Sequence, residues 1–296
     1  MDSLLYYKHS GNYTASGVLL SLGGGAAATV VLSFVYAYVI LYCPFIYINF
    51  FATLFYGGAV GFVGTTLLKR QKVRNTRMAV VVGLALGLFA LYAQWVVWIF
   101  ALLGRSNIER SLPVLAFDPA VLWSVILEVN EVGAWELKGS APTGGMLWAI
   151  WGLEALLIGG AAVFTALSLM DDEPYCESCN SWCTAESNVA ELQTCDPDEL
   201  KRRMELKDFG YLERLGGRAA DASSWLQAGL HKCGRCGMTN TLKVDAVSVT
   251  VDKKNKESKS TKTVLDKLLV TQGECATIRE IGRKLANPPA AAAKAS

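Results

Sequence analysis

Four long apolar segments dominate the first part of the chain, and mixed polar sequence fills the rest. The apolar segments cover about residues 15–42, 45–68, 78–103 and 146–170. A helix needs roughly 20 apolar residues to cross the hydrocarbon core of a bilayer, and all four segments meet that length. We therefore predict an all-α, four-helix transmembrane bundle over residues 1–170, with a first span that is retained rather than cleaved as a signal peptide.

The connections between the spans predict their orientation. Only Cys43 and Pro44 separate the first two spans, which indicates a tight helical hairpin because proline ends a helix. Five basic residues follow the second span: Lys69, Arg70, Lys72, Arg74 and Arg77. Short loops rich in Lys and Arg stay in the cytoplasm, so we expect both termini inside and the 104–145 loop outside. Contact with anionic lipid is an alternative role for the same cluster.

Glu154 is the one charged residue inside the predicted spans. It lies roughly 12 Å from the start of the fourth span, at 1.5 Å per residue. An intramembrane carboxylate is costly, which makes it a candidate functional group. Gln94 and the tyrosines of the first two spans are its candidate partners. We favour a structural role, in which Glu154 locks the third and fourth spans together.

Glycines recur along the spans at a spacing that permits close helix packing. Gly57/Gly61 and Gly83/Gly87 are GxxxG pairs, which let two helix backbones approach. We expect them to pack within the chain, with an oligomer interface as the alternative.

The external loop contains a further helix signal. Asp118 and Pro119 are typical of a helix start, as N-cap and first-turn residue. The apolar stretch 119–132 is too short to span, so we expect a cap over the bundle, an interfacial helix or a re-entrant segment. Three tryptophans fall where an aromatic belt is expected: Trp135, Trp148 and Trp151.

The charges divide the chain at about residue 170. Residues 1–170 hold only 9 of the 28 Lys and Arg and 7 of the 26 Asp and Glu, so the second part is rich in charge but neutral overall. Nucleic-acid binding needs a basic surface, and we expect no nucleic-acid partner. An acidic, proline-containing hinge at residues 171–174 joins the two parts.

Two CxxC pairs lie in the second part: Cys176/Cys179 and Cys233/Cys236. Four thiolates from two such turns form the usual tetrahedral site of structural zinc. The arrangement resembles a zinc ribbon, which implies a bound Zn²⁺. A gap of 53 residues separates the two pairs, where a compact ribbon has about 15–20, so we expect a helical insert. Cys183 or His231 could replace one ligand, and thiol–disulfide exchange is a different use of the same cysteines.

The remaining patterns predict a small α+β domain over residues 171–286 and a disordered tail at 287–296. Its expected elements are, in order, a helix at 197–215 capped by Asp196, a helix at 219–230, strands at 241–251 and 261–271, and a helix at 274–285. The charged turn at 252–260 between the strands is a solvated tip or a contact for a partner or lipid.

Catalytic signatures are absent from the sequence. Only two histidines occur, and no Walker loop or GxSxG motif is present. Four cysteine ligands would also leave zinc no open position for a substrate. We therefore expect a non-enzymatic, membrane-anchored adaptor, sensor or assembly subunit that presents its zinc-ribbon domain to a cytosolic protein. An oligomeric channel or transporter using Glu154 and a membrane-bound thiol oxidoreductase are the alternatives.

Overall fold

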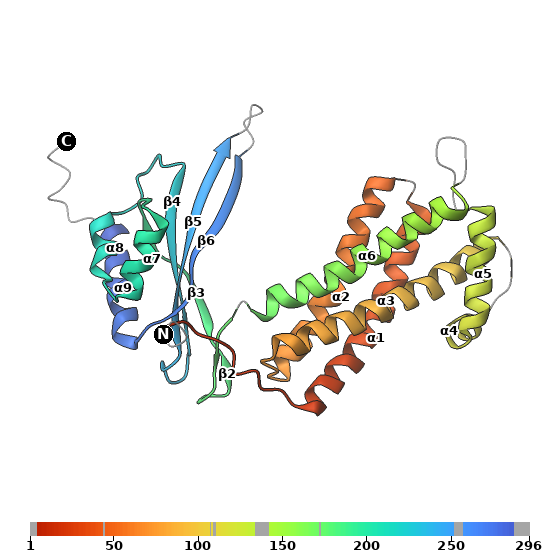
Figure 1. Ribbon diagram of the computed structural model, residues 1–296, viewed down its shortest axis with the longest axis horizontal. Coiled ribbons are helices and arrows are strands. Elements are labelled where there is room, and N and C mark those ends of the chain that lie inside the picture. The colour runs from red at the N-terminus through yellow and green to blue at the C-terminus, as the bar shows by residue number, and fades with distance from the viewer. Residues whose placement is uncertain are drawn as a thin grey trace. The chain divides into compact units, whose positions relative to one another are not determined.

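The computed structural model contains two compact units, a helical domain and a sheet domain (Figure 1). The structure describes residues 5–43, 45–106, 108, 111–133, 142–171, 173–251 and 257–286. Residues 5–9 group with 173–286 in the sheet domain, whereas the sequence placed them with the helices. Pro44, Trp135, Asp172, most of the charged turn and the predicted tail lie outside the described residues.

Four long apolar helices form the helical domain: α1 (Ala15–Tyr42), α2 (Ile46–Arg70), α3 (Thr76–Arg105) and α6 (Gly144–Met170). Each is long and apolar enough to cross a membrane. Their bounds agree with the predicted spans to within about two residues at each end. α2 and α3 each pack against the other three, which makes them the centre of the bundle.

Two short helices pack on the bundle, α4 (Leu112–Phe117) and α5 (Pro119–Val132). The Asp118 carboxylate accepts hydrogen bonds from the Ala120 and Val121 N–H groups at 3.1 and 3.2 Å, which confirms the predicted N-cap. One face of α5 is buried against α3 and α6, as expected of a cap. α4 was not predicted.

Aromatic rings pack together near α5. Trp148 and Trp151 contact each other with ring centroids 5.2 Å apart, and each contacts a further tryptophan. Trp151 packs on Trp95 at 4.8 Å, and Trp148 packs on Trp123 at 5.5 Å. Part of the predicted aromatic belt therefore packs between α3, α5 and α6, with Trp151 buried and Trp148 and Trp123 exposed.

The GxxxG pairs of α2 and α3 both face α6. A Cβ atom at Gly57 would collide with the backbone carbonyl oxygen of Ile158, and one at Gly61 with that of Ala162. The second pair packs on the same stretch of α6: Gly83 and Gly87. The glycines therefore serve packing within the chain, the interpretation that we favoured from the sequence.

The sheet domain is built on a four-stranded antiparallel meander in the order β3-β4-β5-β6. Its strands are β3 (Thr184–Leu192), β4 (Ser224–Lys232), β5 (Asn240–Val251) and β6 (Glu257–Leu269). Three helices cover one face of this sheet (Figure 1): α7 (Pro197–Glu205), α8 (Gly210–Leu215) and α9 (Gln272–Ala286). The core between the two layers is apolar, because alternate strand residues such as Leu226, Ala228 and Leu230 point toward the helices.

Three element predictions in this domain need correction. The helix predicted at 219–230 is largely strand β4, because its apolar residues alternate with a period of two. The helix predicted at 197–215 is divided into α7 and α8, since Lys207 adopts a left-handed φ of 61° after α7 ends. β6 begins at Glu257, inside the predicted turn.

The N-terminal segment, residues 5–9, extends the sheet at the outer edge of β6. The Tyr7 N–H donates to the Lys267 carbonyl at 2.9 Å, and the Leu269 N–H donates to the Leu5 carbonyl at 2.8 Å. The hydroxyl of Tyr6 also donates to Glu205 of α7 at 2.6 Å. A stretch that the sequence analysis included in the helical part of the chain is therefore part of the sheet domain.

Candidate metal centre

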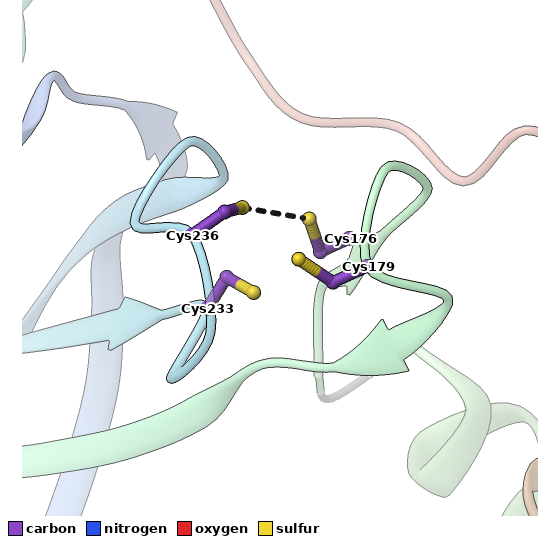
Figure 2. Close-up of side chains that lie close together, drawn as sticks. All are labelled: Cys176, Cys179, Cys233 and Cys236. Atoms are coloured by element: carbon purple, nitrogen blue, oxygen red, sulfur yellow. Dashed lines mark hydrogen bonds between the residues drawn. The ribbon is translucent and has the colours of Figure 1, made fainter.

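Two turns bring the four CxxC cysteines face to face (Figure 2). The first knuckle is the turn between two short strands, β1 (Tyr175–Cys176) and β2 (Ser181–Trp182), which pair with each other. The second knuckle connects β4 to β5 and carries Cys233 and Cys236. Each knuckle contributes two sulfur atoms to one cluster.

The two knuckles share a backbone conformation that suits metal ligation. The residue after the second cysteine has a positive φ in both, 51° at Asn180 and 64° at Gly237. Glycine and asparagine are the residues that tolerate this region best. A glycine or an asparagine directly after a CxxC pair is therefore the sequence signal for this turn, and the sequence analysis did not single out Asn180.

The sulfur atoms have the spacing of a tetrahedral site. One ligand atom from each of Cys176, Cys179, Cys233 and Cys236 lies within 4.8 Å of all the others. The sulfur atoms of Cys176 and Cys236 are 3.5 Å apart. Tetrahedral zinc with bonds of about 2.3 Å holds its sulfurs about 3.8 Å apart, whereas a disulfide requires about 2.05 Å. The donor set and its dimensions therefore fit a zinc ion better than a disulfide.

Strand pairing explains why a long insert does not separate the knuckles. β3 begins directly after the first knuckle and β4 ends directly before the second. They pair antiparallel, with Thr184 opposite Lys232. The ends of the β3–β4 hairpin thus lie together at the cysteines, and α7 and α8 occupy the connection at its other end, which confirms the expected helical insert.

The thiols have unequal tendencies to ionise. Burial opposes ionisation of Cys233, but backbone N–H groups of Cys236 and Arg235 stabilise its thiolate and lower its pKa to about 6. A hydrogen bond with the Cys236 thiol raises the pKa of Cys179 to about 12. Clustered thiolates repel each other, and a cation such as Zn²⁺ would stabilise all four in the ionised form.

The two alternative ligands lie beside the cluster rather than in it. Cys183 is buried against Cys176 and Cys233, and its thiol donates to the Thr239 carbonyl at 3.6 Å. Burial raises the pKa of Cys183 to about 12, as a neighbouring thiol does for Cys179, so its position outside the group of four sulfurs is what sets Cys183 apart. His231 is buried in β4 opposite Thr241 and is not among the residues of the described cluster.

Glu154 belongs to a second polar group, inside the helical domain. Its carboxyl group accepts a hydrogen bond from the Tyr36 hydroxyl of α1 at 2.5 Å. That hydroxyl also lies 2.9 Å from the Thr53 hydroxyl of α2. Tyr36 stacks on Tyr56 with centroids 4.5 Å apart, and Gln94 is buried separately in α3. A tyrosine partner was expected, but it joins α6 to α1 and α2 rather than to α3.

The basic cluster lies at the α2–α3 connection. Lys72 has a left-handed φ of 58°, which turns the chain between the helices. The Arg74 side chain donates to the Lys72 carbonyl at 2.8 Å, and its backbone N–H donates to the Asn12 carbonyl at 2.8 Å. The cluster therefore marks the end of the bundle at which α1 begins.

Fold and site together define a class of protein: four long apolar helices joined to a small antiparallel sheet domain with a zinc-ribbon-like cluster of four cysteines. Comparisons of the chain with protein-family models, with curated proteins and with solved structures gave no match.

Proposed function

We propose that this protein is an integral membrane adaptor, sensor or assembly subunit that presents a structural zinc-ribbon domain to a cytosolic protein partner. The observation that carries the proposal is the closed set of four cysteines on a folded domain that is covalently joined to four apolar helices. A closed Cys₄ site stabilises a small domain and offers no position for substrate.

Exposed apolar side chains on the long helices support membrane insertion. Phe55 of α2 is 76% exposed, and Leu156 and Phe164 of α6 are 74% and 71% exposed. Apolar surface of this extent is unfavourable in water and is what lipid tails cover. The basic α2–α3 connection supports a cytoplasmic position for that end of the bundle, because short loops rich in Lys and Arg stay in the cytoplasm. Because α1 begins and α6 ends at the same end, both termini and the sheet domain would be cytoplasmic.

The β5–β6 hairpin is the surface that we assign to a protein partner. It continues beyond the end of β4, whose first residue, Ser224, pairs with Ser248. Beyond Val249 the last residues of β5 are solvent-exposed, including Val251 at 59%. A projecting strand pair has free backbone edges, which bind partners by strand addition.

Metal analysis of the detergent-purified protein tests the core of this proposal. We expect one zinc ion per chain in the wild type, loss of that zinc in Cys233→Ser, and full retention in Cys195→Ser, whose cysteine lies outside the cluster. Absence of zinc, together with freely titrating CxxC thiols, would reject the structural site and favour the thiol oxidoreductase.

Partner recovery tests the adaptor role. Cross-linking and co-purification from membranes should recover the same cytosolic protein with the wild type and with Cys195→Ser, but not with Cys233→Ser. Equal recovery with Cys233→Ser in zinc-free form would show that the folded ribbon is not the docking element.

The Tyr36–Glu154 pair favours one second candidate, an oligomeric channel or transporter. We prefer the structural role, since one carboxyl group tied to a tyrosine connects three helices without forming a path. Glu154→Gln, which preserves hydrogen bonding, should then leave the ion and proton permeability of proteoliposomes unchanged. Loss of a measurable wild-type flux in this variant would support transport.

A further inference from the structure

The N-terminal segment, which pairs with β6, also contacts the first knuckle. The Tyr175 N–H donates to the Tyr7 hydroxyl oxygen at 2.9 Å, and the Tyr7 hydroxyl donates to the Tyr175 carbonyl at 3.2 Å. Tyr175 is 1% exposed and directly precedes the ligand Cys176. The Tyr7 hydroxyl therefore binds both backbone polar groups of Tyr175, the residue directly before the first ligand.

The same segment reaches the other strand of the knuckle through aromatic contacts. The rings of His9 and Trp182 lie 5.9 Å apart, and the rings of Trp182 and Tyr175 lie 5.0 Å apart. His9 is itself packed edge-on against Tyr7 at 5.2 Å. Residues 7–9 thus contact both strands of the first knuckle: Tyr7 bonds to Tyr175 of β1, and His9 packs on Trp182 of β2.

The first knuckle also contacts the second knuckle, through cysteine sulfurs. β1 and β2 form a separate two-stranded sheet that does not join the meander. The Cys176 and Cys236 sulfurs are 3.5 Å apart, and the Ser181 hydroxyl is 4.0 Å from the Cys233 sulfur. Thiols are weak donors and acceptors, so these contacts bind loosely until a metal ion joins the sulfurs. The first knuckle therefore lies between the metal centre and the N-terminal segment.

We propose that Tyr7 is a positioning residue for the metal centre, and that metal binding is coupled to docking of residues 5–9 on the sheet domain. The inference rests on the proposed structural zinc site. Groups that orient the ligands of a metal commonly change its retention, and coupling between two binding events is reciprocal. A metal ion that fixes the first knuckle also fixes the surface to which the N-terminal segment docks.

The coupling would control how the sheet domain is attached. The chain passes between the two units at residues 9–10 and again at 172–173. With the segment docked, the sheet domain has two attachments to the helical domain. Without metal, residues 5–9 would detach, and the attachment at 172–173 would remain alone. Metal occupancy thereby sets the freedom of the domain that we assign to partner binding.

Zinc-release kinetics on the detergent-purified full-length protein test the role of Tyr7. A chromophoric chelator such as pyridylazoresorcinol reports the rate. We expect Tyr7→Phe to carry one zinc ion per chain but to release it about tenfold faster than the wild type, the lower end of the effect of groups that orient metal ligands. Tyr211→Phe makes the same chemical change in α8, away from both knuckles, and should release zinc at the wild-type rate.

Hydrogen exchange of the wild type tests the reciprocal effect and does not depend on a variant. After zinc is removed by chelation, the amide hydrogens of Tyr7 and Leu269 should lose protection from exchange. Each of these amides donates a hydrogen bond between the N-terminal segment and β6, and detachment of the segment would break both bonds. Full zinc loading with unchanged release from Tyr7→Phe, or retained protection of these amides without zinc, would overturn the coupling alone. A wild type that holds no zinc would overturn the zinc site as well.

Discussion

Gly61 lies where α2 and α6 approach each other closely, and replacing it by alanine tests the packing of the helical domain. A Cβ atom at this position would overlap the Ala162 carbonyl oxygen and lie 3.0 Å from the Cα and carbonyl carbon of the same residue. These neighbours are backbone atoms, so a rotamer change cannot remove the overlap. The two helices have to move apart in Gly61→Ala.

The expected cost follows from that separation. Carbon atoms pack at about 3.5–4.0 Å, so the helices would separate by roughly 0.5–1 Å, which loses about a quarter to a half of the local dispersion energy. Overpacking of this kind costs about 1–3 kcal/mol. At roughly 2–4 °C per kcal/mol for a domain of this size, we expect the Tm to fall by about 2–12 °C.

Thermal unfolding in detergent, followed by far-UV circular dichroism, measures the effect. Gly23→Ala is the matched control, since a Cβ there meets nothing within 4 Å. Alanine is about 1 kcal/mol more favourable than glycine inside a helix, so the control should be at least as stable as the wild type. If Gly61→Ala unfolds at or above the temperature of Gly23→Ala, the close approach of α2 and α6 is refuted.

Three further predictions concern local interactions. Glu186 of β3 accepts hydrogen bonds from the Arg279 guanidinium of α9 at 2.8–3.1 Å, and these bonds lower its pKa. At pH values above the ordinary glutamate pKa of about 4.3, Glu186→Gln should therefore lower the free energy of unfolding by about 1 kcal/mol. The difference in denaturant midpoint between wild type and variant should vanish as the pH falls through the lowered pKa of Glu186. Asp118→Ala should destabilise the helical domain by about 1 kcal/mol through loss of the α5 cap, whereas Asp118→Asn should not, as thermal unfolding would show. Asn180→Val should reduce zinc content because a β-branched residue is strained at a φ of 51°, and Asn180→Gly should retain it.

The helical domain was largely predictable because its signals are local. Length and apolarity fix a long helix, and the Asp118–Pro119 pair marks the start of α5. The hydrogen-bond partner of Glu154 was harder to predict, because it depends on helix faces that meet only in the folded bundle. The sequence offered both Gln94 and the tyrosines to Glu154, and only the folded bundle brings the Tyr36 hydroxyl within hydrogen-bond distance of the carboxyl group.

The sheet domain was harder to predict because its strands resemble helices in composition. β3 contains alanine and glutamate, and a bulge between Glu186 and Ala190 interrupts its alternation. β4 carries Leu226, Ala228 and Leu230 with a period of two, but alanine and leucine also favour helices. Long-range pairing decides both cases, and no local pattern encodes it.

The candidate metal centre depends both on local sequence motifs and on long-range strand pairing. The CxxC pairs specify the ligands locally, but the gap of 53 residues gives no reason for the pairs to meet. The register of β3 on β4 supplies that reason, since pairing Thr184 with Lys232 places a knuckle at each strand end. A shift of that register by one residue would turn the apolar side chains of one strand away from the α7–α9 core as well as displacing the cysteines. The register that buries the core is therefore also the register that brings the four cysteines together.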